Sequence, residues 1–324
     1  MNENRFRWRP LSAAPRENTV PCELIYRSGE FAFRVRNDAV RLPEELVGCE
    51  VAALMMDPDD VLYAACRVKG HEIARFAPDG SFLDFVKLDE EIGRVHGMFL
   101  NRAHELWITD DGFHVARKFD QAGRCIQTLG TPHVPSDTGV DPASLNTYLA
   151  YLTIRRAGAP FNKPTKLIET PDGKLFASDG YGNAAVHAFA PDGTLLRTWG
   201  GPGQEPGHFN IPHSIFHDAC GRLWVSDRDN DRVQAFSESG ELLTILDGLL
   251  YPGELWSDGV NLYVSEMDGR ISIFDMDGVL IAEIGHRKTS FSGHSMTGDS
   301  HGNLYIGNFG EYPIVKFERL REKC

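Results

Sequence analysis

The chain has 324 residues, of which 42% are hydrophobic and 24% charged, and its formal net charge is −13. A chain of this length can bury a large core, whereas the acidic balance excludes a nucleic-acid surface, which needs clustered lysine and arginine. The polar start and the lack of any run of about 18 apolar residues predict neither a signal peptide nor a membrane-spanning helix.

The first predicted element is β-structure in residues 23–35. The sequence there, ELIYRSGEFAFRV, alternates polar and apolar residues and is typical of a strand pair or one long strand. This segment precedes a series of repeats, so it is additional to them.

From residue 50 onward, short apolar strands recur between Asp-Gly and similar turns, and no long amphipathic helix competes with them. Each of six units has an aromatic residue after a turn and a phenylalanine 11 to 13 residues later. A unit of about 40 residues with four short strands is typical of a propeller blade. The sequence therefore predicts an all-β, six-bladed β-propeller of one domain over residues 1–324, with blades in about 50–318. The six pairs, expected in the second and third strands of each blade, are Tyr63 and Phe76, Trp107 and Phe119, Phe176 and Phe189, Trp224 and Phe236, Tyr263 and Phe274, and Tyr305 and Phe317.

One spacing between units is unusually long. Trp107 and Phe176 lie 69 residues apart, whereas the other four spacings are 39 to 48 residues. The excess corresponds to an insertion at about residues 131–161 between the second and third blades. A long connection in a compact domain is often a lid or a binding loop, and this one is expected on the face where the innermost strands begin.

The sixth unit ends at Phe317 and leaves no room for a fourth strand. We therefore predict that the N-terminal segment 1–48 completes the sixth blade. Closing the ring in this way leaves no free sheet edge.

Three histidines share one position in the repeat. His96, His213 and His294 each lie 11 residues before the aromatic residue of the second, fourth and sixth blades. This position is the start of the innermost strand, so three imidazoles from alternate blades are expected to converge on the axis. A single histidine at a strand start is usually structural, but three in the same phase predict a His₃ metal site with an open position, as in catalytic zinc sites.

The loops after the second strand of each blade are expected on the same face. They carry Arg67, Tyr181 and Arg228, which we interpret as catalytic candidates, because a tyrosine beside an arginine can transfer protons and arginine can hold a carboxylate. Arginines that only form salt bridges with nearby aspartates are the alternative. The aspartates at these strand ends are better explained by hydrogen bonds to loop amides than by calcium binding.

Residues 50–318 resemble NHL-repeat propellers, and more narrowly the peptidyl-α-hydroxyglycine α-amidating lyase family and its bacterial relatives. The stretches FNKPTKLIETPDGKLFASDGYGNAAVHAFAPDGTLLRTWG, GHFNIPHSIF and LWVSDRDNDRVQAF carry the resemblance. It implies a zinc ion on His96, His213 and His294, a catalytic tyrosine at Tyr181 and active-site arginines at Arg67 and Arg228. The family splits an N-substituted α-hydroxyglycine into a primary amide and glyoxylate without consuming water.

The chain departs from this family near its third histidine. Where the family has Met-Pro-His-Asp, this chain has Ser292-Gly293-His294-Ser295, and Gly182 replaces a disulfide cysteine. The aspartate in that motif helps to hold the family's structural calcium, so the resemblance does not predict the calcium here. A related carbinolamide, or another small hydroxylated molecule, is the expected substrate.

These observations predict a metal-dependent lyase with zinc, or alternatively ferrous iron. The ion would polarise a substrate hydroxyl, Tyr181 would act as general base, and Arg67 and Arg228 would hold anionic charge. Two alternatives stay open, namely a metal-dependent hydrolase of a lactone or amide, and a non-enzymatic NHL interaction module.

The expected partner is a small molecule, with no nucleic acid and no membrane. Six scattered cysteines without a CxxC pair predict a reduced, cytoplasmic protein.

Overall fold

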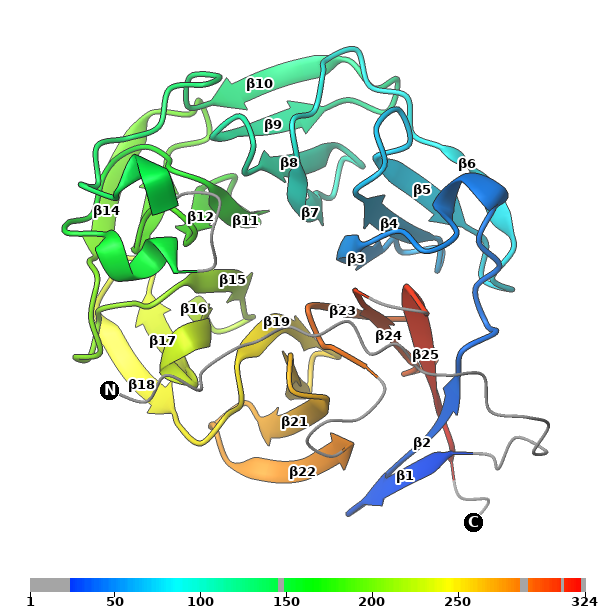
Figure 1. Ribbon diagram of the computed structural model, residues 1–324. Helices are drawn as coiled ribbons and strands as arrows, with labels where there is room; N and C mark the ends of the chain where they lie inside the picture. Colours follow the sequence, from blue (N-terminus) through cyan, green and yellow to red (C-terminus); the bar gives the residue numbers. More distant parts are fainter. Residues whose placement is uncertain (1–23, 145–148, 286–290, 310–311, 322–324) are drawn as a thin grey trace.

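The computed structural model describes residues 24–144, 149–285, 291–309 and 312–321. These residues form six antiparallel sheets arranged around a central axis (Figure 1). The sheets follow one another along the chain, and each begins with its innermost strand. The predicted six-bladed β-propeller is therefore confirmed.

The first three blades are regular four-stranded sheets, each with its strands in chain order from the axis outward. Their strands are β3 (Val51–Met56), β4 (Leu62–Cys66), β5 (Ile73–Phe76) and β6 (Phe82–Phe85); β7 (Val95–Leu100), β8 (Leu106–Asp110), β9 (Val115–Phe119) and β10 (Cys125–Leu129); and β11 (Pro164–Glu169), β12 (Leu175–Asp179), β13 (Ala185–Phe189) and β14 (Leu195–Gly200).

The fourth and fifth blades repeat this order, and the sixth begins with three strands. Their strands are β15 (Pro212–His217), β16 (Arg222–Asp227), β17 (Arg232–Ser237) and β18 (Leu242–Leu246); β19 (Pro252–Ser257), β20 (Asn261–Glu266), β21 (Arg270–Asp275) and β22 (Leu280–Gly285); and β23 (Ser295–Gly298), β24 (Leu304–Gly307) and β25 (Ile314–Arg319).

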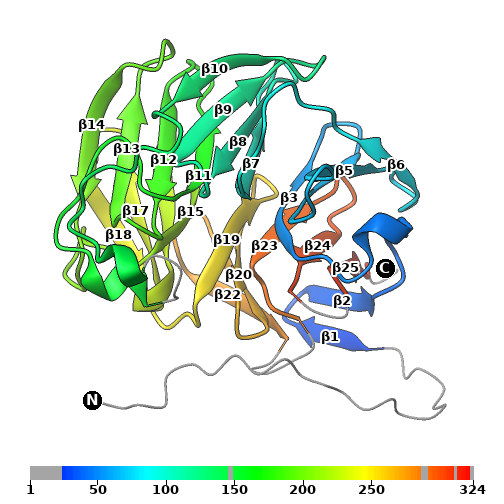
Figure 2. The same cartoon turned by 45° about the horizontal axis from the view of Figure 1, so that its top comes forward.

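The N-terminal segment completes the sixth blade, as predicted, but it supplies two strands. The hairpin of β1 (Ile25–Ser28) and β2 (Phe31–Arg36) joins the blade through pairing of β2 with β25. The sixth sheet thus has five strands, and Figure 2 shows β1 and β2 beside β25 from a second direction. The part of the predicted closing segment before Leu24 lies outside the described residues.

The repeated aromatic pairs lie where the periodicity places them. All six first members are in second strands and all six phenylalanines are in third strands, and most are fully buried between neighbouring sheets. Trp107 and Trp224, for example, have no exposed surface. Burying large rings between blades removes apolar area from water and holds adjacent sheets together.

A β-bulge occurs at the start of the innermost strand in each of the first five blades. Pairing of β7 with β8 skips His96, and pairing of β15 with β16 skips His213. A bulge leaves one residue outside the ladder and re-aims its side chain. His294 lies just before β23, at the equivalent point of the sixth blade.

The predicted insertion connects β10 to β11 and contains the short 3-10 helices η2 (Pro142–Ser144) and η3 (Ala150–Thr153). Residues 145–148 lie outside the described part. Two more short helices, η1 (Glu44–Leu46) and η4 (Arg228–Asn230), lie before β3 and after β16. Among the described residues, no helix has the length and apolar character needed to cross a bilayer.

Candidate metal centre

The three repeat-phase histidines meet at the axis of the ring. His96, His213 and His294 are 2% to 3% exposed, and their ring centroids are 4.7 to 5.2 Å apart. One nitrogen from each ring lies within 4.8 Å of the others. Alternate blades thus bring together residues that are 81 to 198 positions apart in the chain, as the spacing predicts.

The other nitrogen of each ring is bonded to the backbone of the next blade. A carbonyl oxygen only accepts, so each Nδ1 carries the proton and each Nε2 presents a lone pair toward the axis. Second-shell bonds of this kind fix both the tautomer and the ring orientation of metal-binding histidines. The three bonds are His96 Nδ1 to Thr165 O at 2.8 Å, His213 Nδ1 to Gly253 O at 3.0 Å, and His294 Nδ1 to Ala52 O at 3.0 Å.

These accepting carbonyls occupy the same repeat position as the histidines, in the third, fifth and first blades. Each belongs to a residue that its own ladder skips, so the bulge leaves the carbonyl available. Gly97 permits the close approach, because a Cβ there would lie 2.4 Å from Thr165 O. The sequence placed these residues in register with the histidines, but it carried no sign that their backbone would be used.

Within the described residues, the Tyr181 hydroxyl is the one group that can donate a proton to these Nε2 atoms. Tyr181 Oη lies 3.0 Å from His96 Nε2 and 3.1 Å from His213 Nε2, so its single proton can be donated to only one of them. No described donor is bonded to Nε2 of His294. A cluster of lone pairs with too few protons fits a cation, and three neutral imidazoles are a common ligand set for zinc.

Protonation is disfavoured at this cluster. Burial lowers the pKa of His213 to about 3, and it holds the pKa of His96 and His294 well below the usual value. The positive charge of Arg67 acts on the pKa of all three rings in the same direction. The donor set therefore suits a metal ion better than a proton.

Arg228 lies directly beside Tyr181. It begins η4, its side chain is 9% exposed, and its Nη1 donates to Tyr181 Oη at 3.3 Å. Its guanidinium also lies over the Tyr181 ring and donates from Nε to Asp229 at 2.8 Å. The structure thus brings Tyr181 into contact with His96 and His213, and Arg228 into contact with Tyr181.

Arg67 reaches the same centre from the rim. Its Nη1 donates to Glu50 at 2.9 Å, and its guanidinium lies over the ring of Phe309. Phe309 in turn packs against His294, with ring centroids 4.4 Å apart. Arg67 therefore forms a salt bridge, with Glu50 rather than with an aspartate, and lies near the histidines; its catalytic role stays a prediction.

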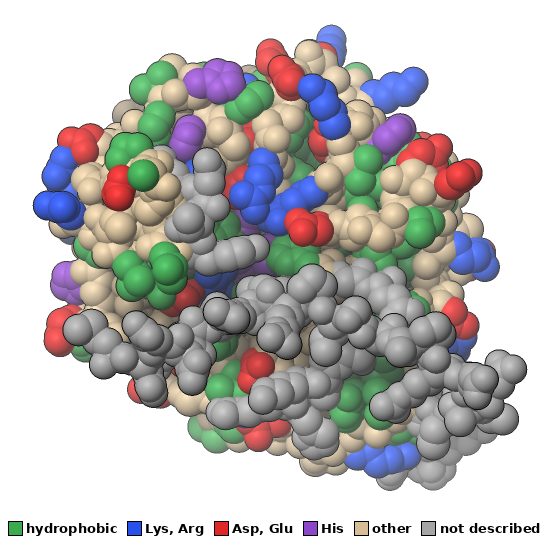
Figure 3. Space-filling model, in the orientation of Figure 1, with side chains coloured by type: hydrophobic (Ala, Val, Ile, Leu, Met, Phe, Trp, Pro, Cys, Tyr) green, Lys and Arg blue, Asp and Glu red, His purple; other side chains and the backbone are tan. Residues whose placement is uncertain are grey.

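Two further cationic residues, which the sequence analysis did not single out, lie around the candidate metal centre. Arg94, at the start of the second blade, and Lys163, at the start of the third, lie two positions before His96 and Thr165. Lys163 has a positive φ of 65° before a proline, a strained conformation of the kind found at functional sites. Figure 3 shows lysine and arginine side chains around the central hollow, with histidine at its floor.

The aspartates at the ends of second strands have a structural role, as expected. Asp110 accepts from the backbone N–H groups of Gly93, Arg94, Gly112 and Phe113. Asp179 and Asp227 accept from the backbone N–H groups of Asn162 and Asn210 in the same way. These carboxylates hold the loops on the histidine face.

The insertion packs against the loop that carries Tyr181. Thr138 Oγ1 donates to Gly182 O at 2.7 Å, and Gly182 N donates to Asn162 O at 3.0 Å. A Cβ on Gly182 would lie 2.1 Å from the Asn162 side chain, so only glycine fits beside Tyr181. The insertion thus lies on the histidine face, as predicted, and positions the tyrosine.

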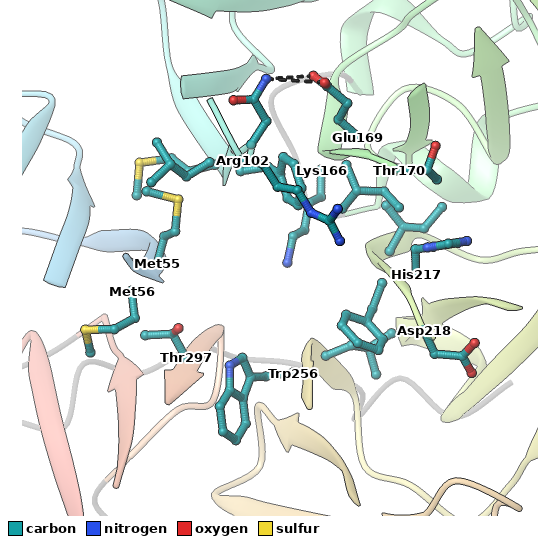
Figure 4. Close-up of a pocket in the computed structure, with 18 of the residues that line it drawn as sticks. Met55, Met56, Arg102, Lys166, Glu169, Thr170, His217, Asp218, Trp256 and Thr297 are labelled. Carbon is teal, nitrogen blue, oxygen red and sulfur yellow. Dashed lines mark hydrogen bonds between the residues drawn. The ribbon is translucent and has the colours of Figure 1, made fainter. Parts of the chain in front are cut away.

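A second hollow opens at the other end of the central channel and does not include the histidines. It has a volume of about 630 Å³, and its walls are largely apolar (Figure 4). Met55, Trp256 and Lys166 lie around it in the close-up, and Lys166 is paired with Glu254 at 2.6 Å. The turns after the innermost strands form its mouth, so it belongs to the opposite face of the ring.

Comparison with known proteins agrees with this architecture. NHL repeat-containing protein 3 of Mus musculus is 33% identical over 242 residues, which is 71% of this chain and 64% of that protein. The chain is an NHL-repeat propeller that resembles the amidating lyases. A probable peptidyl-α-hydroxyglycine α-amidating lyase, pgal-1 of Caenorhabditis elegans, is 30% identical over 146 residues, or 44% of this NHL-repeat propeller and 36% of the relative.

The matched regions are thus less than two thirds of each relative's length. A solved streptogramin B lyase superposes with a TM-score of 0.62 over 89% of this NHL-repeat propeller and 98% of the lyase chain, at 14% identity. That likeness concerns the fold. No protein-family model matches the chain.

Proposed function

We propose that this NHL-repeat propeller is a metal-dependent lyase that cleaves the carbon–nitrogen bond of a small carbinolamide such as an α-hydroxyglycine derivative. The observation that carries the proposal is the convergence of three unprotonated Nε2 atoms within 4.8 Å of one another, two of them within hydrogen-bond distance of the Tyr181 hydroxyl. His96, His213 and His294 would hold zinc, or alternatively ferrous iron. The similarity to an amidating lyase supports the reaction class.

A divalent ion on these imidazoles would supply Lewis acidity to a substrate hydroxyl. In the reaction, the hydroxyl loses its proton, a carbonyl forms at that carbon, the C–N bond breaks and the nitrogen gains a proton. The products are an amide and an aldehyde, and no water is consumed.

Tyr181 Oη is the protein atom placed to exchange the hydroxyl proton as general base. Arg228 donates to this oxygen, and a donor cation favours the anionic form of a phenol. Burial acts in the opposite direction and raises the pKa of Tyr181, so Arg228 and Arg67 are needed to offset it. The two arginines also provide charge for an anionic group of the substrate.

Replacing one histidine tests the metal and the reaction together. We expect His213→Ala to lose both bound metal, measured by elemental analysis, and cleavage of N-benzoyl-α-hydroxyglycine. His217→Ala is the control, because His217 lies at the far end of β15 and pairs with Glu238. Full activity of chelator-treated protein would contradict the proposal.

Labelled water separates the lyase from a hydrolase of a lactone or amide. The lyase leaves the amide product free of ¹⁸O from the solvent, whereas a hydrolase incorporates one atom into its product. A protein that is purified without stoichiometric metal and cleaves no such substrate would favour an interaction module instead.

We also propose a reducing, cytoplasmic location and a small molecule as the partner. Among the described residues, Cys49, Cys66, Cys125 and Cys220 are free thiols, which supports this location. A disulfide in protein isolated from its native cells under thiol-blocking conditions would contradict it.

A further inference from the structure

One carboxylate beside the candidate metal centre has no hydrogen-bond donor within the described part of the chain. Asp111 follows β8 and is 1% exposed, yet neither of its side-chain oxygens accepts a hydrogen bond from any described residue. It forms an ion pair with Arg94, whose Nη1 lies 3.5 Å from Oδ2. Buried carboxylates are normally satisfied by several donors, as Asp110 is, so this exception calls for a ligand.

The position of Asp111 connects it to the site. Its backbone N–H donates to Arg94 O, two residues before His96. Asp111 begins the turn after β8 and is adjacent to Asp110, whose carboxylate is bonded to loop amides. The cations that act on the pKa of Asp111 are Arg94, Arg67 and Lys163, and Asp111 itself is among the charges that act on the pKa of Tyr181.

We propose that Asp111 accepts a hydrogen bond from a substrate N–H group, while Arg67, Arg94 and Lys163 hold an anionic group on the neighbouring atom. The inference rests on the proposed function for the location of the substrate. The substrate hydroxyl is assigned to the metal and Tyr181, so the N–H is the donor that remains. Asp111 thereby determines specificity for amides over esters and lactones.

The physical reason is the cost of a buried carboxylate that accepts no hydrogen bond. An amide ligand supplies the missing donor, whereas an ester or lactone places an oxygen lone pair against the carboxylate. A site built to bond a substrate N–H rejects the analogue without it much more strongly than an apolar pocket rejects a missing methylene group. The cationic neighbours attract both kinds of ligand and therefore do not discriminate between them.

The test compares two stable ligands that differ at one atom. N-benzoylglycine carries the N–H and the carboxylate, whereas O-benzoylglycolate has an ester oxygen in place of the N–H. Neither has the hydroxyl that the lyase reaction needs, so calorimetric binding to zinc-loaded protein does not depend on turnover. We expect the amide to bind at least about tenfold more tightly than the ester.

Variants at Asp111 then test whether this residue causes the preference for the amide over the ester. In Asp111→Ala the two affinities should agree within about threefold, while Asp111→Asn, which keeps one acceptor oxygen, should retain part of the preference. Asp84→Asn is the control, because Asp84 pairs with Arg75 on the outer strand of the first blade. Melting temperatures of all three variants verify that they fold.

Equal affinity of the wild-type protein for both ligands, or an unchanged preference in Asp111→Ala, would overturn the inference. Release of benzoate from the ester would also overturn it and would favour the hydrolase. Failure to cleave N-benzoyl-α-hydroxyglycine, with the Asp111-dependent preference intact, would contradict the proposed lyase but leave this inference standing.

Discussion

Each histidine of the candidate metal centre is prepared for an ion by a bond to main-chain oxygen. Because Nδ1 donates to a neighbouring carbonyl, Nε2 cannot carry the proton in the neutral ring. An ion would therefore bind to rings whose orientation is already fixed, which would lower the entropic cost of binding. Substitution of a side chain cannot remove the accepting main-chain carbonyls, so the mutational tests below change side chains of the site instead.

Tyr181→Phe tests the role of the hydroxyl separately from the metal. We expect retention of zinc, because the three ring nitrogens remain, and a fall in kcat of about 10²- to 10⁴-fold through loss of proton transfer. Tyr312→Phe, at an exposed tyrosine, should keep full activity. Loss of zinc in Tyr181→Phe would instead assign the tyrosine to the metal site.

Asp111→Asn tests the charge state of the buried Asp111 carboxylate through protein stability. Burial raises the pKa of Asp111 to about 6 in the folded protein, whereas the unfolded value is about 3.9. Above pH 6 the Asp111 carboxylate is ionised in the folded state, where burial disfavours its charge. The free energy of unfolding of the wild type should therefore fall, relative to that of the variant, by on the order of 2–3 kcal/mol as the pH rises from 4 to 6. Melting temperatures across this range should diverge in favour of Asp111→Asn as the pH rises. If the two melting temperatures instead converge as the pH rises, the folded state stabilises the ionised form of Asp111.

The predictability of these residues differs for a physical reason. The histidines were found because their fixed offset from a core aromatic residue is visible in the sequence, and Tyr181 because it lies in a loop after a second strand, on the face predicted for the histidines. Asp111 and Arg94 owe their importance to contacts between a loop and a neighbouring strand. That Asp111 accepts no hydrogen bond from the described residues can be seen only in the structure, not in the sequence.

At the level of elements, β-bulges and one insertion build the site. The bulges aim His96 and His213 inward and leave the accepting carbonyls outside the ladders. The insertion fixes the loop with Tyr181 through Thr138 and Asn162. The sequence indicated the insertion by its length, but the partner loop could not be read from composition.

Thr138→Val tests this support, because it keeps the shape of the side chain and removes the donor to Gly182 O. We expect a loss of about 1 kcal/mol in stability and a several-fold fall in kcat, with zinc retained. The matched control is Thr153→Val, since Thr153 Oγ1 donates within the insertion to Ala150 O. If both variants reduce kcat equally, the insertion acts as a whole rather than through the contact with Gly182.

For the whole molecule, ring closure is the feature on which the arrangement depends. The periodicity was sufficient to predict six blades and closure by the N-terminal segment. It did not predict that both hairpin strands would join the last sheet. The two-residue turn at 29–30, with Gly29 at a φ of 55°, forms that hairpin and adds β1 as a fifth strand.

Phe33→Ala tests the closure. Phe33 is fully buried on β2 against Phe317 of β25, so its truncation should lower the free energy of unfolding by about 3–5 kcal/mol in urea titrations. Leu243→Ala on β18, where the side chain is half-exposed, should cost much less. A loss below about 1 kcal/mol for Phe33→Ala would show that the ring does not need this contact.

The pairing of β2 with β25 also constrains when the protein can fold during its synthesis. About 280 residues separate these two strands, which at typical translation rates corresponds to roughly 15–60 s. Throughout that interval the edge of β2 has no partner from the ring, and exposed strand edges favour aggregation. The molecule therefore cannot reach its closed form on the ribosome until the last blade has emerged, so nascent chains are expected to need protection by chaperones up to that point.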